Sequence, residues 1–298
     1  MPFFTITLIH NQALNLPEIL LAYKSQSLVP DCFVFVLDRC TDKSQEHIQR
    51  FAVSNTCIVI ENTYGDSFMA GYCRDLGLSS LELSPTDVVL FLDGDCIPSR
   101  NLFRSMYSSS CSDVESLAIG ARENQICQGS SNFNIDGREG TPWLKGKVFQ
   151  RGIDNTVNAM CLAKIRMLIW SCCFAANAAA ISKIKNINTT LGGRARMFSE
   201  SFDGKWGGED DYVGLIAMLW GVPVVAVNPE DCVQHIWHPP RTDNSFMHKA
   251  KEKYKQLHTY AIECNAPGLA NAATDPQIFE RDFFSKLRSG MPDACFGK

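Results

Sequence analysis

Short apolar runs alternate with helical patterns through the first half of the sequence, and this rhythm restricts the fold more than any other feature. Two of the runs, FVFVL and VVLFL, are apolar without interruption, as expected for strands buried on both faces of a parallel sheet. We predict strands at Phe3–Ile9, Cys32–Leu37, Cys57–Glu61 and Val88–Leu92. The alternation is typical of βαβ units, so we predict an α/β protein with a mostly parallel central sheet flanked by helices.

Apolar residues at helical spacing predict the helices that cover this sheet. The first predicted helix carries Leu16, Ile19, Leu20 and Tyr23 on one face. The helix before the fourth strand carries Phe68, Tyr72, Leu76 and, less regularly, Leu78. A further amphipathic helix is predicted from Ser245 to Glu263, with Phe246, Ala250, Tyr254, Leu257 and Ala261 on one face.

Composition excludes several classes of protein. With 45% hydrophobic residues in 298, the chain can bury a sizeable core, which excludes disorder as its main state. The 28 basic and 32 acidic residues leave a net charge of -4, which argues against nucleic acid as a partner. The 13 cysteines contain no CxxC pair, so they indicate neither a disulfide framework nor a zinc ribbon.

The sequence also gives an expectation for location. The N-terminal MPFFTITLIHNQALN lacks the basic start and the long apolar stretch of a secretory signal. The uncharged runs Met167–Ser182 and Tyr212–Asn228 are short or interrupted, the second by Gly221 and Pro223, which leave a helix end, a turn and the strand VPVVAV. Neither reaches the roughly 20 apolar residues that a membrane span needs. We therefore expect a cytoplasmic protein without a transmembrane segment.

Two carboxylates follow the last of the predicted strands, in the run DVVLFLDGDCIPS. Asp93 and Asp95 flank Gly94 there, and ligands of open α/β sheets collect at the carboxyl ends of the strands. Two carboxylates separated by a glycine, which permits a tight turn, can face one divalent cation and the phosphates bound to it. A solvated turn at a strand end is the alternative explanation.

A second cluster, Trp206-Gly207-Gly208-Glu209-Asp210-Asp211, stands directly before the helical pattern YVGLIAMLWG. Acids at a helix start complement the positive end of the helix dipole, which explains them without any function. The helix dipole does not explain Trp206, Gly207 and Gly208. Paired glycines let the backbone pass close to a ligand, and a tryptophan ring is a common platform for sugars. One of the carboxylates could then serve a bound ligand as a general base.

Two histidines follow a predicted strand in the segment VQHIWHPP. His235 and His238 are three residues apart on an extended segment and point to opposite faces, so we expect at most one of them to bind a metal. An ordinary surface or hydrogen-bonded role explains either one equally well.

Together, these segments resemble the inverting glycosyltransferases of the GT-A fold, a Rossmann-like fold that binds nucleotide-diphosphate sugars. The resemblance is to the broad family 2 and its relatives with a galactosyltransferase-type C-terminal half, and it covers about residues 3–245. The segments similar to the family's first strand and helix and to its motifs, in chain order, are FFTITLIHNQALNLPEILLAYKSQ, FVLDRCTDKS, GYCRDLGL, LFLDGDCIPS, SCCFAANAAAISK, WGGEDDYVGLIAMLWG and HIWHPPRTDN. Asp75 stands where the family usually has asparagine, and alanines replace the glycines before Asn177.

The resemblance implies a role for each matched residue. It assigns binding of the nucleotide and donor sugar to His10, Asp38, Arg74, Asp93, Gly94 and Asn177. It makes Asp95 the direct metal ligand, while Asp93 contacts ribose or the metal. His238 or His235 completes the metal site, and the trailing Asn244 favours His238. Asp210 takes the family's position of catalytic base, Glu209 orients acceptor or donor, and Trp206, Gly207 and Gly208 line the acceptor site.

The implied activity is transfer of a sugar from a nucleotide-diphosphate sugar, with a UDP-sugar favoured, to a hydroxyl acceptor with inversion and with Mn²⁺ or Mg²⁺ as cofactor. The acceptor is a saccharide, a lipid-linked group or a protein, chosen by the loops Gly129–Arg151 and Asn186–Gly204. We expect residues 1–125 to form the donor half, 126–245 the acceptor and catalytic half of the same domain, and 246–298 a C-terminal helix and tail. The alternatives are a sugar nucleotidyltransferase and a non-catalytic protein that binds nucleotide sugars.

Overall fold

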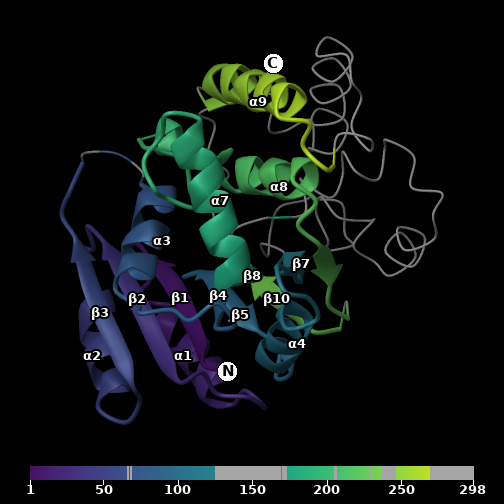
Figure 1. Cartoon of the computed structure of the whole chain (residues 1–298). Helices are drawn as coiled ribbons and strands as arrows, with labels where there is room; N and C mark the ends of the chain where they lie inside the picture. The colour runs from purple at the N-terminus through teal and green to yellow at the C-terminus, as the bar shows by residue number, and fades with distance from the viewer. Residues whose placement is uncertain are drawn as a thin grey trace, which may run out of the picture.

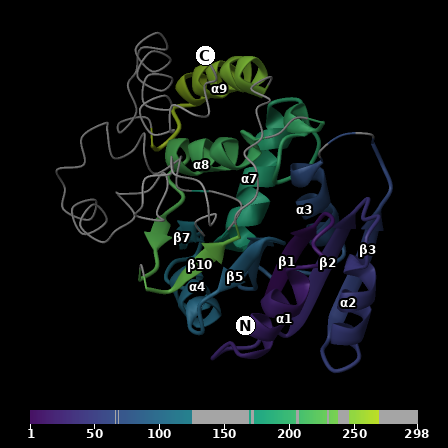
Figure 2. The same cartoon turned by 180° about the vertical axis from the view of Figure 1, so that it is seen from behind.

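The computed structural model describes residues 1–65, 67, 69–124, 169, 173–204, 207–228, 230–236 and 246–268. Its strands form one sheet of seven strands and one of three. Helices lie on both faces of the larger sheet, as the two opposite views show (Figures 1 and 2). The predicted α/β class is confirmed.

The larger sheet is mostly parallel, as predicted. Its strands in spatial order are β3 (Cys57–Asn62), β2 (Cys32–Asp38), β1 (Phe3–Ile9), β4 (Val88–Asp93), β8 (Cys173–Asn177), β6 (Leu117–Ile119) and β9 (Val224–Ala226). Among these strands β8 alone runs antiparallel to its neighbours, β4 and β6. The four strands predicted for the first half match β1 to β4 to within one residue.

Alternating side chains of the strands divide the core into two layers. The helices are α1 (Leu16–Lys24), α2 (Ser44–Ala52), α3 (Ala70–Ser79), α4 (Leu102–Ser110), α7 (Ala178–Thr190), α8 (Glu209–Leu219) and α9 (Phe246–Glu263), with a 3-10 helix η1 (Glu200–Phe202). Ile6, Val34 and Phe91 share one cluster with α3, α7, α8 and α9. Phe33 and Leu90 share the other with α1, α2 and α4.

The predicted helix faces are partly confirmed. Helix α1 buries all four of its predicted residues, and α9 buries Tyr254, Leu257 and Ala261. In α3, the predicted Leu78 is buried, while Tyr72 and Leu76 are half-buried and pack against the same core cluster. The buried residues of α3 include Cys73, Arg74, Asp75, Gly77 and Leu78. Helix α2 was not predicted.

The smaller sheet brings a late segment of the chain beside the turn after β4. Its strands are β5 (Cys96–Pro98), β10 (Cys232–His235) and β7 (Ala121–Asn124), in that order. Strand β10 is antiparallel to β5, with His235 opposite Cys96. No helix in the described ranges combines the length and apolar composition that crossing a membrane requires.

Candidate active site

The carboxyl ends of three neighbouring strands meet at one edge of the larger sheet. Strand β1 ends at Ile9, β2 at Asp38 and β4 at Asp93. The parallel register places Leu8 opposite Asp93 and Ile9 opposite the residue before Asp38. The side chains that follow these strands therefore gather at the edge where open α/β sheets bind ligands.

The turn that follows Asp93 has no room for a side chain at Gly94. A Cβ atom there would lie 2.6 Å from the backbone oxygen of Leu8 and 3.2 Å from Cα of Ile9. Both are backbone atoms of a buried strand and cannot turn aside. Glycine at this position lets the two flanking carboxylates sit directly against the end of β1.

We expect Gly94→Ala to lower the free energy of unfolding by about 1–3 kcal/mol, the usual cost of forcing extra volume into a packed region. It should also displace the carboxylates of Asp93 and Asp95, because both must shift with the turn. Denaturant unfolding measures the first effect, and a crystal structure of the variant shows the second. Wild-type stability and undisplaced carboxylates would contradict this account of the turn.

Arg74 joins two acids that are far apart in the sequence. Its Nη2 lies 2.6 Å from Oδ1 of Asp93, and its Nη1 lies 3.0 Å from Oε1 of Glu209. The Arg74 side chain is 2% exposed, and its guanidinium lies over the ring of Phe198 at 5.5 Å. The buried guanidinium of Arg74 thus connects the end of β4 with the first turn of α8. Its positive charge stabilises the negative charges of Asp93 and Glu209, which burial alone would disfavour.

Two polar atoms in this ion-pair cluster have no hydrogen-bond partner among the described residues. They are Nε of Arg74 and Oε2 of Glu209, and both are buried. Burying an unpaired polar atom costs free energy, and such atoms are commonly satisfied by a ligand or by water. The Nε donor of Arg74 and the Oε2 acceptor of Glu209 are therefore available to hydrogen-bond a ligand or water.

Helix α8 presents its acids to this region. It begins after Gly207 and Gly208, whose φ angles of 85° and 92° are left-handed values that favour glycine. Glu209 is buried, and burial together with neighbouring Asp210 raises its pKa to about 7 against the opposing effect of Arg74. Asp210 is only half-buried, so it can be reached from outside.

A carboxylate and a histidine come together at the smaller sheet. Nε2 of His235 lies 3.5 Å from Oδ2 of Asp95, because β10 pairs with β5 directly after the turn. Within the described part of the chain, no group of three or more His, Cys, Asp or Glu side chains could hold a metal ion. Asp95 and His235 are a pair of such side chains in direct contact beside the end of β4.

Comparisons with known proteins identify the fold. No family model matches the chain, and no curated protein matches its sequence. The structure of S. aureus TarS 1-349 in complex with UDP-GlcNAc matches 98% of this chain and 74% of that one, with a TM-score of 0.63 at 14% identity. Mannosyltransferase PcManGT from Pyrobaculum calidifontis, in complex with GDP-Man and Mn²⁺, matches 97% and 73%, with a TM-score of 0.52 at 14% identity. The chain has the GT-A fold.

The match is one of architecture, since the identities are low. Another structure of TarS 1-349 has a TM-score of 0.60 at 15% identity, and the chain spans 65% of its length. In this GT-A fold, the cluster around Arg74 lies at the carboxyl edge of the central sheet.

The end of β2 carries a second polar group. Asp38 is buried, and Arg39 pairs with both oxygens of its carboxylate, Nε at 2.9 Å and Nη2 at 2.8 Å. Nδ2 of Asn62 lies 2.8 Å from Oδ1 of Asp38, and Nδ1 of His10 lies 2.6 Å from its backbone oxygen. The structure thus brings the predicted His10 and Asp38 together. The sequence patterns did not single out Arg39 and Asn62, although Arg39 directly follows β2 and Asn62 ends β3, which is the signal that could have found them.

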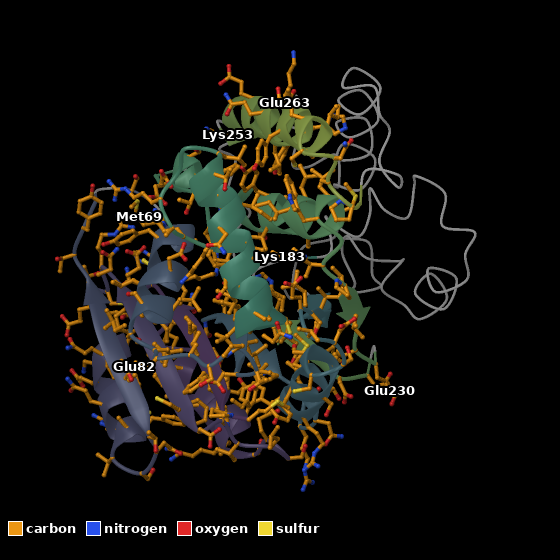
Figure 3. The ribbon with its side chains drawn as sticks, viewed as in Figure 1. Met69, Glu82, Lys183, Glu230, Lys253 and Glu263 are labelled. Carbon is orange, nitrogen blue, oxygen red and sulfur yellow. The ribbon has the colours of Figure 1, made fainter. Side chains whose placement is uncertain are left out.

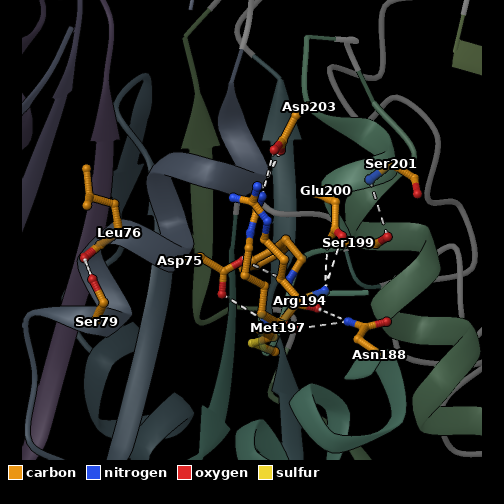
Figure 4. A network of polar contacts seen from close by, with 12 residues as sticks. Asp75, Leu76, Ser79, Asn188, Arg194, Met197, Ser199, Glu200, Ser201 and Asp203 are labelled. Atoms are coloured by element: carbon orange, nitrogen blue, oxygen red, sulfur yellow. Dashed lines mark hydrogen bonds and ion pairs between the residues drawn. The ribbon is translucent and has the colours of Figure 1, made fainter. Parts of the chain in front are cut away.

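The residue after Arg74 holds the segment that leads to α8 (Figure 4). The Asp75 carboxylate accepts hydrogen bonds from the backbone N–H groups of Met197 and Phe198, at 2.8 and 2.9 Å. Arg196 bridges Asp75 and Asp203, with its Nε 3.2 Å from the first and its Nη1 2.6 Å from the second. Burial raises the pKa of Asp75 to about 6, against the opposing effect of Arg196.

This arrangement ties the segment between α7 and α8 to α3. The loop predicted at 186–204 was wrong at its start, because residues 186–190 belong to α7. The arrangement also fixes the ring of Phe198 beneath Arg74. The family resemblance pointed to position 75 only as a departure from asparagine, and the pairing with Arg196 depends on tertiary contacts between distant segments.

Asn177 lies away from this edge. It pairs with Val88, the first residue of β4, so it stands at the opposite end of that strand from Asp93. Its Oδ1 accepts a hydrogen bond from the N–H of Ala180 at 2.9 Å and so caps α7. We therefore leave Asn177 out of the proposed site.

Several predicted site residues lie outside the described residues. They are Trp206, His238 and the loop Gly129–Arg151. Their predicted roles in acceptor and metal binding stay predictions.

Proposed function

We propose that the chain is a metal-dependent glycosyltransferase that moves a sugar from a nucleotide-diphosphate sugar to a hydroxyl acceptor with inversion. The observation that carries this proposal is the convergence of Asp93 and Glu209, from distant segments, on buried Arg74 at the carboxyl edge of a GT-A sheet. The complexes of TarS with UDP-GlcNAc and of PcManGT with GDP-Man and Mn²⁺ support a nucleotide-sugar donor in this fold. We favour a UDP-sugar.

Asp210 is the proposed base. It directly follows Glu209, which Arg74 holds, and it is more exposed than Glu209. Successive helix residues point about 100° apart, so the two acids serve different tasks. Glu209 stays paired with Arg74 and orients the sugars, while the Asp210 carboxylate accepts the proton of the acceptor hydroxyl as that oxygen attacks the anomeric carbon.

Asp95 and His235 are the proposed metal ligands. Two ligand atoms that bind one ion at right angles, each about 2.1 Å from it, lie about 3 Å apart. The observed 3.5 Å between Oδ2 of Asp95 and Nε2 of His235 is close to that separation. A bound Mn²⁺ or Mg²⁺ would neutralise the charge that develops on the diphosphate leaving group. The resemblance favoured His238, but the position of His235 leads us to prefer His235.

We also propose a family for the chain and a role for each half of its domain. We place the chain beside family 2 and its relatives with a galactosyltransferase-type C-terminal half, and assign donor binding to residues 1–125 and acceptor binding and catalysis to 126–245 of the same domain. The continuity of β1 to β4 with β8, β6 and β9 in one sheet supports a single domain. The acceptor is a saccharide, a lipid-linked group or a protein.

A panel of nucleotide sugars, tested with Mn²⁺ and Mg²⁺, examines the proposed function directly. Slow donor hydrolysis needs no acceptor, and NMR of the glycoside formed when an acceptor is present gives the anomeric configuration of the product. Nucleotide binding without any hydrolysis or transfer would support the non-catalytic alternative. Formation of a nucleotide sugar from a sugar phosphate would support the nucleotidyltransferase.

We expect Asp95→Ala to abolish Mn²⁺-dependent binding of UDP while the fold stays intact, because a partly exposed carboxylate at a strand end contributes little to the core. Calorimetric titration of UDP with and without Mn²⁺ measures the loss. His235→Ala should weaken binding more than His238→Ala. Unchanged metal-dependent binding in Asp95→Ala would refute the metal assignment, and a larger loss in His238→Ala would restore His238 as the ligand.

A further inference from the structure

The start of α8 has little conformational restraint of its own. Its N-cap is Gly208, which offers no side chain to hydrogen-bond the first turn, and Gly207 precedes it. Glycine has the widest choice of backbone conformations, and two in succession make a flexible joint. The acids that follow this joint nevertheless need a fixed position, because misplacement by about 1 Å can cost 10²-fold in rate.

A hydroxyl from the C-terminal helix holds this joint. The Tyr254 Oη donates a hydrogen bond to the backbone oxygen of Gly208 at 3.2 Å. The same oxygen accepts the first helical hydrogen bond of α8, from the N–H of Tyr212 at 3.0 Å. Helix α9 lies over α8 in both views, and side chains fill the space between them (Figures 1 to 3).

The ring of Tyr254 is itself fixed. It is 3% exposed and stacks on Tyr212 with ring centroids 6.0 Å apart. Phe202 of η1 lies 5.5 Å from Tyr212 and 6.4 Å from Tyr254. The three rings pack α9 against both the start of α8 and the loop before it. This packing holds the Tyr254 hydroxyl in one position, at the backbone oxygen of Gly208.

We infer that Tyr254 is a positioning residue for the catalytic acids. Its hydroxyl fixes the carbonyl of Gly208, and through it the first turn of α8 with Glu209 and Asp210. The inference rests on the proposed function. Helix α9 contains none of the predicted site residues, but through Tyr254 it would contribute to the active site.

The test compares Tyr254→Phe with the matched variant Tyr260→Phe. Each removes one hydroxyl from α9, but the ring of Tyr260 stacks on Trp220 at the other end of α8, 5.7 Å between centroids. We expect Tyr254→Phe to lower kcat for transfer about tenfold, with the KM of the donor changed less than twofold. The amide of Tyr212 should exchange with solvent several-fold faster. Tyr260→Phe should match the wild type in all three.

The outcomes separate this inference from the proposed function. Wild-type kcat and wild-type exchange in Tyr254→Phe would overturn the positioning role and leave the glycosyltransferase proposal standing. Equal losses of kcat in both variants would also overturn it, because they would indicate a general effect on α9. If the wild-type protein transfers no sugar, the proposed function fails, and the exchange rate of the Tyr212 amide alone decides whether the hydroxyl fixes the start of α8.

Discussion

Replacing Asp210 by Asn is expected to lower the rate of sugar transfer by roughly 10²-fold or more, because the amide cannot accept the proton of the acceptor hydroxyl. The substitution should leave the helix start intact. Oδ1 of Asp210 accepts a hydrogen bond from the N–H of Asp211 at 2.9 Å, and the amide oxygen of Asn can accept the same bond. Donor binding and metal dependence should persist. The rate is measured at saturating donor and acceptor, and donor binding by titration.

Asp211→Asn is the matched control, since it removes one negative charge from the same helical turn. A charge near a helix end contributes about 0.3–1 kcal/mol, so this variant should lose little activity. A near wild-type rate in Asp210→Asn would remove the base from the mechanism. A product that keeps the anomeric configuration of the donor would do the same and would indicate a retaining enzyme.

Arg74→Met is expected to lower the free energy of unfolding by about 3–5 kcal/mol, the usual cost of removing one partner from a buried ion pair. The largest part should come from Glu209, whose side chain is 5% exposed and forms no other ion pair within the described ranges. Asp93 is 29% exposed, so water can partly compensate for its loss of Arg74. Denaturant unfolding of the purified variant gives the magnitude.

Two further variants test the origin of that loss. Arg74→Met combined with Glu209→Gln should recover part of the stability, because the second change removes the uncompensated charge. Lys183 of α7, marked in Figure 3, forms a partly exposed ion pair with Glu115. Lys183→Met breaks this pair and should cost no more than about 1 kcal/mol. Wild-type stability of Arg74→Met would show that the acids do not depend on this cation.

The strands and the acidic segments were predictable because their signals are local. Apolar runs located β1, β2 and β4, and the acids stood directly after such a run or before a helical pattern. Parallel strands bring such ends to a common edge, so the general position of the site followed from the βαβ rhythm alone.

The burial of charged residues in α3 was not predictable from apolar spacing. The helix packs against the sheet through Gly77, where a Cβ would lie 2.7 Å from Cγ2 of Ile6, and it also buries the charged Arg74 and Asp75. Charged residues are assigned to the surface by any pattern of hydropathy. Their burial depends on Glu209 and Arg196, which lie more than a hundred positions away.

The antiparallel strand β8 has a consequence for how the chain folds during synthesis. In the native sheet β8 stands between β4 and β6, so the apolar edge of β4 has no native partner until residues 173–177 have been made. About 80 residues separate the end of β4 from β8. At roughly 5–20 residues per second the ribosome needs about 4–16 seconds to supply them. During that interval the strand VVLFLD presents an unpaired edge, the feature that most readily recruits strands from other chains. The yield of folded protein in a cell should therefore depend on how fast this stretch is translated and on chaperones that cover the edge of β4.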